Sequence, residues 1–367
     1  MAEERLISLD AFRGMTIAGM ILVNNPGSWE NVYPPLRHAD WHGWTPTDLV
    51  FPFFLFIVGV SLSLSLSKRK HQEPGGLQLY AKIFRRTLIL FALGLLLNLI
   101  PAFDFNSIRL PGVLQRIALC YLVAALLFLK TTPRTRILIG SGILVFYWLI
   151  LTFFPVPGVG AGILTLKGNI CAYIDTKLLA GHLYTPGFDP EGILSTLPAI
   201  ATTLIGTLCG DWLRHTQRSA VKFTGLLVSG TGLVLLGYTL HAYFPINKQL
   251  WTSTYVLFTA GAALIVLGMC FGLIDSLGYK KWALPFLVFG GNAIAVYLGS
   301  SLLARIIVSI KIPDTGGIQP LKAILYKRFF STWAGDYLGS LLFPVAVLLI
   351  WFLIMLPLYR KNIHLKI

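Results

Sequence analysis

Titratable and aromatic residues are concentrated in the stretch HADWHGWTPTD, residues 38–48. An imidazole can act as general base or nucleophile near neutral pH, and a nearby carboxylate can orient it. His38 and His42 are four residues apart, but the further ligands and the H-E-x-x-H pattern of a zinc site are absent. The stretch therefore predicts acid–base or nucleophilic chemistry without a metal, and its composition leaves both histidines as candidates.

The same stretch ends in a predicted helix start. Thr45 is a suitable N-cap, Pro46 fits the first helical position, and Asp48 falls at the third. A carboxylate at this position faces the positive end of the helix dipole. Asp48 therefore either caps the helix, or orients an imidazole or pairs with an arginine. We expect Arg116 to be that arginine, because it lies near the same depth on another apolar segment.

Several polar residues interrupt apolar segments. Gln115 and Arg116 follow one another in RLPGVLQRIALCY, Asn292 lies in FGGNAIAVY, and Asn24 and Asn25 end the first apolar segment. Polar groups in lipid need partners inside the protein, and charged ones usually face a cavity. These residues therefore predict a polar lane through the interior.

Two tryptophans and two acidic residues are candidates for binding an acceptor. Trp41 and Trp44 are typical of an interfacial aromatic belt, and a sugar-stacking platform is the alternative. Asp189 and Glu191 lie in GFDPEG, within a long polar segment expected on the same side. These four residues form the predicted acceptor-binding set.

Basic residues gather after the second apolar segment and at the start of the third. Lys68, Arg69, Arg85 and Arg86 are candidate partners for phosphate groups, which favour Arg and Lys. The same residues also fit the ordinary excess of positive charge at cytoplasmic loops. No glycine-rich phosphate loop accompanies them.

The composition requires that these residues be positioned by membrane helices. The chain is 55% hydrophobic and 12% charged, whereas soluble domains carry about 25% charged residues. Apolar segments long enough to cross a bilayer predict an all-α, polytopic transmembrane bundle of about ten helices, forming one domain over residues 1–367. The predicted segments are 8–25, 46–67, 83–100, 110–130, 136–154, 193–213, 222–243, 252–274, 283–303 and 338–358.

The distribution of Lys and Arg predicts the orientation. With the N-terminus in the cytoplasm, 19 basic residues fall on the inside and 10 on the outside. Both termini are then cytoplasmic, and residues 38–48 face outward. The net charge of +15 is explained by cytoplasmic loops next to anionic membrane lipid. No nucleic-acid-binding motif is present, so nucleic acid is excluded as a partner.

Long stretches in the same order resemble the heparan-α-glucosaminide N-acetyltransferase family. The resemblance runs from about residue 5 to 303, without the lumenal domain of the animal enzymes, and so indicates a bacterial member. The stretches that carry it are RLISLDAFRGMTIAGMILVNN, RHADWHGWTPTDLVFPFFLFIVGVSLSLS, RLPGVLQRIALCYLVAALL, GFDPEGILSTLPAI and PFLVFGGNAIAVYLG.

The resemblance implies site residues. The family pattern His-Ala-Ser-Trp-Asn-Gly matches residues 38–43, which selects His38 and leaves His42 where the family has Asn. The family's functional Asn, in Val-Asn, matches Asn24. The segment between that Asn and the histidine is longer here, so Asn25 stays open as an alternative.

The resemblance also implies an activity. The family moves an acetyl group from cytoplasmic acetyl-CoA, without a metal, to the amine of a terminal glucosamine across the membrane. For this chain we expect that reaction at a bacterial cytoplasmic (inner) membrane. His38 would act as general base or as a carrier of the acetyl group, and Asn24 would position the thioester. The alternatives are an O-acetyltransferase of an envelope glycan and a sugar or amino-sugar transporter. A homodimer is compatible with the sequence.

Overall fold

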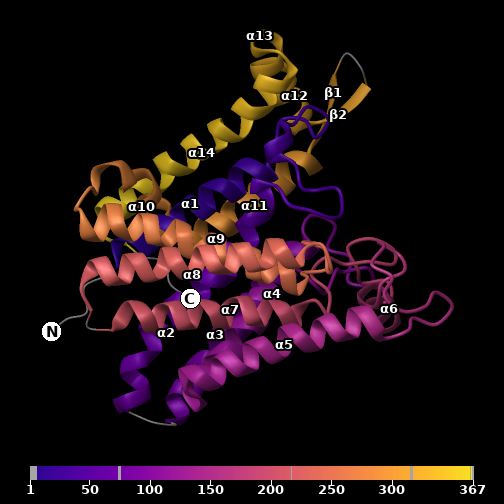
Figure 1. The fold of residues 1–367 in the computed structure, drawn as a ribbon. Coiled ribbons are helices and arrows are strands. Elements are labelled where there is room, and N and C mark those ends of the chain that lie inside the picture. The colour runs from indigo at the N-terminus through magenta and orange to yellow at the C-terminus, as the bar shows by residue number, and fades with distance from the viewer. Residues whose placement is uncertain (1–5, 73–75, 216, 315–316, 364, 366–367) are drawn as a thin grey trace.

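The structure is a bundle of long α-helices with one small β-hairpin (Figure 1). It is a computed structural model that describes residues 6–72, 76–215, 217–314, 317–363 and 365, with only the backbone described at 68–72 and 314. The helices are α1 (Ile7–Asn24), α2 (Val50–Gln72), α3 (Leu77–Leu99), α4 (Val113–Lys130), α5 (Pro133–Phe153), α6 (Ile170–Leu178), α7 (Thr196–Arg214), α8 (Ser219–Leu240), α9 (Ser253–Cys270), α10 (Leu284–Gly291), α11 (Ala293–Ser309), α12 (Leu321–Tyr326), α13 (Thr332–Ala334) and α14 (Asp336–Arg360). The hairpin pairs β1 (Lys311–Asp314) with β2 (Gly317–Pro320) in antiparallel fashion.

The all-α membrane bundle predicted from the sequence is confirmed. Within the described ranges, seven helices are long and apolar enough to cross a membrane, or up to eight if the bent pair α10 and α11 is counted as one span. Two further long helices, α3 and α7, have 23 and 19 residues. Nine of the ten predicted segments each coincide with one helix, with ends that differ by up to six residues, and the segment 283–303 covers two helices.

The segment predicted as one helix over 283–303 is broken at Asn292. Helices α10 and α11 meet there at an angle of 72°, and Asn292 leaves the helical conformation with φ −128° and ψ 38°. The buried Asn292 side chain accepts from the Leu365 N–H (2.7 Å) and donates to the Ile363 carbonyl (3.1 Å). The prediction of a continuous helix was wrong because this asparagine binds the segment that follows α14.

Glycines let two pairs of helices approach closely. A Cβ at Gly59 of α2 would lie 2.0 Å from the Thr203 carbonyl oxygen of α7, and a Cβ at Gly206 would lie 2.2 Å from that of Phe56. A Cβ at Gly290 of α10 would similarly lie 2.0 Å from the backbone of α1. Small residues at such contacts are how membrane helices pack without a hydrophobic driving force.

The loops form two groups at opposite ends of the bundle. At the distal end, where α1 finishes, backbone hydrogen bonds join Gly43 to Ile246 and Leu110 to His182. The loop that follows α1 therefore contacts the loop that follows α8, and the loop that follows α3 contacts the loop that follows α6. At the proximal end, where α1 begins, the Ser8 N–H donates to the Asp275 carboxylate beyond α9.

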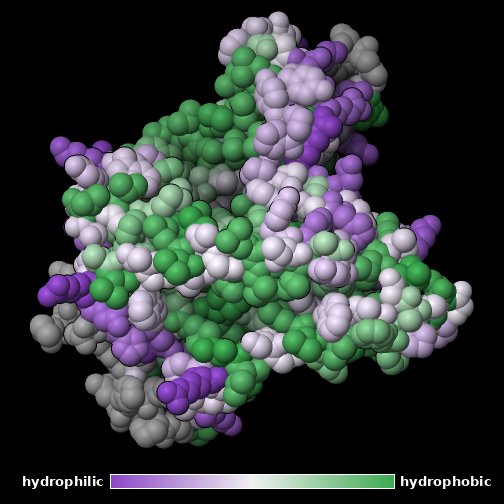
Figure 2. Space-filling model, viewed as in Figure 1, coloured by the Kyte–Doolittle hydropathy of each residue, from purple (hydrophilic) through white to green (hydrophobic). Residues whose placement is uncertain are grey.

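The outer surface is apolar between these two ends. In Figure 2 hydrophobic residues cover most of the visible face, and hydrophilic residues gather towards the two ends of the helices. Helix α8 contributes exposed side chains such as Val228 and Leu235, which are 66% and 59% exposed. This distribution is that of a protein surrounded by lipid.

Candidate active site

The loop before α2 folds back so that His38 approaches the start of that helix. A short 3₁₀ turn at Pro34–Leu36 precedes it, and the Thr45 hydroxyl donates to the Arg37 carbonyl (2.6 Å), which closes the loop. The helix begins as predicted, with Pro46 at the first position of a 3₁₀ turn, Pro46–Leu49, that leads into α2. The Thr45 N–H donates to Asp48 Oδ2 (3.0 Å), and Asp48 N–H donates to the Thr45 carbonyl (2.9 Å).

Asp48 also binds the imidazole of His38. His38 Nδ1 lies 2.6 Å from Asp48 Oδ1, and the Ala39 and Thr45 N–H groups each donate to Oδ2 at 3.0 Å. An ionised carboxylate only accepts hydrogen bonds, so Nδ1 carries the proton and Nε2 keeps its lone pair. The Asp48 side chain is 1% exposed and that of His38 is 39% exposed. The pair therefore presents an oriented base to the distal surface.

Lys248, from the loop after α8, completes this cluster. Its Nζ lies 2.9 Å from His38 Nδ1, 3.3 Å from Nε2 and 3.5 Å from Asp48 Oδ1. Burial lowers the pKa of Lys248, and the charges of Asp48 and Glu191 oppose that shift. The neighbouring Asn247 amide lies 3.3 Å from Nδ1 of the exposed His42. Nothing in the sequence indicated Lys248, because it is 210 residues from His38.

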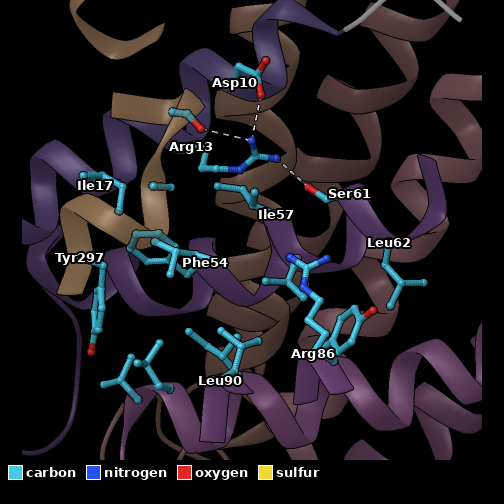
Figure 3. Close-up of a pocket in the computed structure, with 18 of the residues that line it drawn as sticks. Asp10, Arg13, Ile17, Phe54, Ile57, Ser61, Leu62, Arg86, Leu90 and Tyr297 are labelled. Carbon is cyan, nitrogen blue, oxygen red and sulfur yellow. Dashed lines mark hydrogen bonds and ion pairs between the residues drawn. The ribbon is translucent and has the colours of Figure 1, made fainter. Parts of the chain in front are cut away.

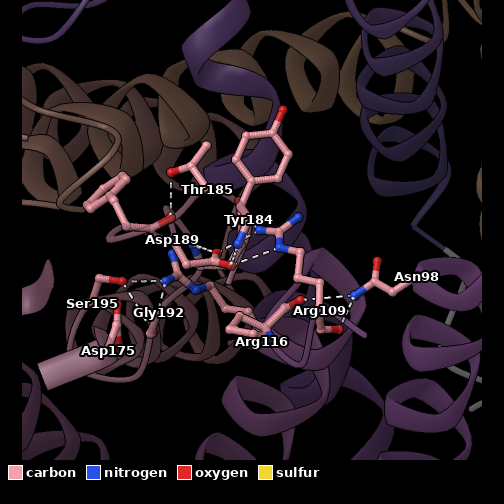
Figure 4. Close-up of polar contacts among 12 residues, drawn as sticks. Asn98, Arg109, Arg116, Asp175, Tyr184, Thr185, Asp189, Gly192 and Ser195 are labelled. Atoms are coloured by element: carbon pink, nitrogen blue, oxygen red, sulfur yellow. Dashed lines mark hydrogen bonds and ion pairs between the residues drawn. The ribbon is translucent and has the colours of Figure 1, made fainter. Parts of the chain in front are cut away.

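The expected pairing of Asp48 with Arg116 was wrong. In the described part of the chain, Arg116 Nη2 donates to Ser195 Oγ (2.5 Å) and to the Gly192 carbonyl (3.2 Å), as Figure 4 shows. Its guanidinium also lies 5.1 Å from the centre of the Trp251 ring. Lys248 supplies the cation beside Asp48 instead.

Arg116 lies in a buried polar cluster with incomplete hydrogen bonding. Its Nε and Nη1, Gln115 Nε2 and Asp175 Oδ2 are buried and without a partner among the described residues. Gln115 packs its amide against α3, where a Cβ at Gly94 would lie 2.2 Å from Oε1. Burial and the charge of Asp189 raise the pKa of Asp175 to about 6, against the Ile193 N–H and Arg116. Polar side chains are therefore buried around Arg116, but Arg116 contacts Ser195 and Gly192 there and not Asp48.

The acidic pair in GFDPEG is held by an arginine from the loop after α3. Arg109 donates from Nε to Asp189 Oδ2 (2.8 Å) and from Nη2 to Asp189 Oδ1 (2.6 Å), as Figure 4 shows. It also binds Glu191. The Tyr184 N–H donates to Asp189 Oδ2, and the Glu191 N–H donates to Oδ1. Each carboxylate oxygen of the buried Asp189 thus accepts two hydrogen bonds, so Asp189 stabilises the loop. Glu191 is the more accessible of the two carboxylates.

The other predicted distal residues differ in exposure. Asn24 is exposed at the end of α1, and its side chain makes no hydrogen bond to the part of the chain that is described. Asn25 is buried, and its side chain donates to the Ile21 carbonyl (2.9 Å). Trp41 donates to the Leu164 carbonyl (2.7 Å) and is partly buried. Trp44 is 41% exposed. Asn24 and Trp44 therefore remain open to a ligand.

A cavity of about 470 Å³ runs between α1, α2, α3, α4, α10 and α11. Figure 3 shows Arg13, Asp10 and Ser61 together on one side of it and Tyr297 away from them. Arg13 donates to Asp10 Oδ1 and to Ser61 Oγ, both at 2.8 Å. The lining between these polar groups is mostly aliphatic and aromatic, and it includes Val113, the first residue of α4 at the distal end.

Of the four predicted phosphate partners, Arg86 lies in this cavity. Its guanidinium is 4.9 Å from the centre of the Tyr121 ring, and its Nε is buried without a partner among the described residues. Arg85 is exposed outside the cavity lining. The side chains of Lys68 and Arg69 lie outside the described part of the chain.

A second cavity of about 910 Å³ at the proximal end shares Asp10, Arg13 and Ser61 with the first. Its lining adds the basic residues Arg214, Lys222 and Lys280 and the acidic residue Asp275. The two cavities therefore meet at Arg13 and offer positive charge at the proximal end and an apolar passage towards the distal end. The sequence signal for the place where the two cavities meet is the pair of charged residues, Asp10 and Arg13, inside the first predicted segment, 8–25.

A family model described as heparan-alpha-glucosaminide N-acetyltransferase, catalytic, matches residues 5–248. The chain belongs to the heparan-alpha-glucosaminide N-acetyltransferase family. It is 30% identical over 313 residues to the human heparan-alpha-glucosaminide N-acetyltransferase, covering 69% of this chain and 46% of the relative. The mouse protein of the same name is 30% identical over 311 residues, which cover 70% of this chain and 47% of the relative.

The chain thus spans a little under half the length of these two relatives. The part that matches the N-acetyltransferase family model contains His38, Asp48 and Lys248, as well as Arg13 and Arg86. The family membership predicted from the sequence motifs is therefore confirmed. The distal cluster and most of the helices around the cavity lie within residues 5–248, which the family model matches.

Proposed function

We propose that the chain transfers an acetyl group from acetyl-CoA at the proximal end to the amine of an amino sugar at the distal end. The acceptor would be a glucosamine-type residue at the non-reducing end of a glycan. The observation that carries this proposal is a base at one end of a membrane bundle and a positively charged cavity that leads from the other. Family membership supports acetyl transfer as the reaction.

The proximal cavities suit the donor chemically. Coenzyme A carries several phosphate charges, which favour Arg and Lys, and a long, nearly uncharged arm that ends in the thioester. Arg13, Arg86, Arg214, Lys222 and Lys280 would bind the phosphate groups, and the apolar cavity would take the arm. Phe54 lines this cavity and lies six residues after Asp48, which corresponds to about 9 Å along a helix. A thioester at the distal end of the cavity would therefore lie near His38.

The dyad of His38 and Asp48 then performs general base catalysis. The acceptor nitrogen forms a bond to the thioester carbonyl carbon, and the carbonyl π electrons move to the oxygen. His38 Nε2 takes the proton that the nitrogen loses, and Asp48 stabilises the imidazolium. The oxyanion then reforms the carbonyl, the C–S bond breaks, and the thiolate receives the proton from His38. Asn24 would donate its amide N–H to the carbonyl oxygen before attack.

The acceptor would bind among Trp44, Trp41 and Glu191. An exposed indole offers a face for a sugar ring, and the Glu191 carboxylate would attract an ammonium group. Attack by His38 itself, with an acetyl-histidine intermediate, is the rival mechanism. Mass spectrometry of the His38 peptide after incubation with acetyl-CoA alone separates the two mechanisms, because only the rival leaves an acetylated histidine.

The proximal end would face the cytoplasm of a bacterial cell, with the bundle in the inner membrane. The excess of basic residues in the proximal loops supports this orientation. Labelling of cysteines placed one at a time in 30–40 and in 217–220 tests it, since an impermeant reagent should reach only the first segment in intact cells. Labelling of 217–220 from outside would reverse the orientation.

Transfer of label from acetyl-CoA tests the proposed function directly. The full chain in proteoliposomes would be given labelled acetyl-CoA and a panel of acceptors with free amines or with hydroxyl groups only. We expect acetylated products from amino sugars. Products from the hydroxyl acceptors alone would instead indicate O-acetylation of a glycan. Uptake of unmodified sugar without acetylation, and without thermal stabilisation by acetyl-CoA, would indicate a transporter.

A further inference from the structure

Lys248 has no role in the mechanism above, although its ammonium is beside the reacting atoms. Its Nζ lies 2.9 Å from His38 Nδ1, the nitrogen that faces Asp48, and 3.3 Å from Nε2, the nitrogen proposed as the base. The backbone around it is fixed, because the Leu250 N–H donates to Asn247 Oδ1 (2.8 Å) and the Trp251 N–H donates to the Lys248 carbonyl (3.1 Å). A hydrogen-bonded loop therefore places a cation beside the imidazole that is proposed to take the proton of the acceptor.

The position of this cation suits developing negative charge. The carbonyl oxygen becomes negative while the attacking amine is hydrogen-bonded to Nε2. The negative oxygen therefore forms close to Nε2 and to the Lys248 ammonium. A donor that is preorganised near this place stabilises the oxyanion far more than a mobile one in water does. The titratable groups that face Lys248 are the imidazole of His38, Asp48 of the turn before α2 and Glu191 of the loop before α7. The two carboxylates favour the ammonium form.

We propose that Lys248 is a further catalytic residue, whose ammonium donates a hydrogen bond to the oxyanion formed on the acetyl carbonyl. This inference rests on the proposed acetyl transfer. The acceptor nitrogen bonds to the carbonyl carbon, the π electron pair moves to oxygen, and Lys248 shares one proton with that oxygen without losing it. When the carbonyl reforms, the C–S bond breaks, the thiolate leaves with the proton from His38, and the Lys248 hydrogen bond is released.

A structural role makes different predictions. If Lys248 only neutralised Asp48, the loss of Lys248 would lower stability and shift the loop. The contact of Lys248 with Asp48, at 3.5 Å, is however longer than the 2.6 Å contact of His38 with Asp48. The rate would then depend on pH in the same way with any side chain that keeps the fold. An oxyanion donor, in contrast, must carry its charge for turnover.

Three variants of the full chain in detergent or proteoliposomes test the proposal with labelled acetyl-CoA and glucosamine. Lys248→Met removes the charge at similar volume, Lys248→Arg keeps it at every accessible pH, and Lys167→Met is the control, since Lys167 is exposed on another distal loop. Thermal melting and the Kd for acetyl-CoA report folding and donor binding. We expect Lys248→Met to lower kcat by about 10²–10³, the usual effect of one oxyanion donor, with an unchanged donor Kd.

The pH profile supplies a readout that a structural role would not change. Because burial lowers the pKa of Lys248, wild-type turnover should fall in alkali below the range of an ordinary lysine. Lys248→Arg should move that loss of turnover to higher pH. If Lys248→Met does not fold, the pH profile of Lys248→Arg alone tests the proposal. An active wild type with Lys248→Met within threefold of it, or an unmoved alkaline limb in Lys248→Arg, overturns the role of Lys248 alone. A wild type that transfers no acetyl group overturns the proposed function and this inference together.

Discussion

Replacing Asp48 by asparagine should force the wrong tautomer on His38. The amide has one accepting oxygen, whereas the carboxylate accepts from His38 on Oδ1 and from two backbone N–H groups, of Ala39 and Thr45, on Oδ2. The amide oxygen is expected at the Oδ2 position, because two donors there would otherwise face an NH₂ group. The NH₂ group then donates to Nδ1, which places the imidazole proton on Nε2.

The magnitude follows from what each contact does. A catalytic histidine in the wrong tautomer costs about 10⁴ in kcat in the serine-protease case, and general base catalysis is worth about 10²–10⁴. We expect a loss of about 10³–10⁴, or about 4–5.5 kcal/mol in activation free energy. The helix start keeps both backbone hydrogen bonds, so the fold and the Kd for acetyl-CoA should change little.

The assay is single-turnover transfer of labelled acetyl to glucosamine, with thermal melting as the check on folding. Asp40→Asn, an exposed residue of the same loop, is the control and should behave as wild type. The double variant with His38→Ala should be no slower than His38→Ala alone, because residues that act as a unit are not additive. Turnover within tenfold of wild type in a folded Asp48→Asn protein would refute the dyad.

His38→Ala should lower turnover by about 10²–10⁴ with donor binding intact, whereas His42→Asn should be mild because the family pattern has Asn there; the reverse result would reassign the base. Arg86→Glu should weaken acetyl-CoA binding by about tenfold or more, given the worth of hydrogen bonds to charged groups, and Arg85→Glu should not; equal effects in titration calorimetry would make both residues topology signals. Because the pKa of Asp175 is raised to about 6, the folded state should lose up to about 3 kcal/mol as pH rises from about 4 to above 6. Asp175→Asn should remove that dependence in thermal melts, and an unchanged slope would contradict it.

The helices were predictable because hydropathy alone decides which segments enter lipid. Their ends were predicted to within about six residues, since polar residues and turns must leave the bilayer. The break at Asn292 was not predictable in the same way. Its cause is a pair of hydrogen bonds to the segment after α14, 71 and 73 residues away, and hydropathy carries no information on such contacts.

His38 was selected by its resemblance to the family pattern, and its contacts in the structure were only partly predicted. Asp48 was a candidate because the rules for helix starts place a carboxylate there, and the same position brings it to His38. The choice of Arg116 as its cation failed because similar depth on two helices does not imply the same face. Arg116 points to Ser195, and the cation at Asp48 comes from a loop.

The helices determine where the distal loops lie relative to one another. Lys248 and His38 are 210 residues apart, but both lie in loops that connect helices at the distal face, so the bundle limits their separation. Loop–loop hydrogen bonds such as Gly43 N–H to the Ile246 carbonyl (2.8 Å) then set the register between them. Mutations can separate two contributions. Asp48 orients the base His38, and a second loop supplies the cation Lys248. Asp48→Asn should change the tautomer while the ammonium stays, and Lys248→Met should remove the charge while the tautomer stays.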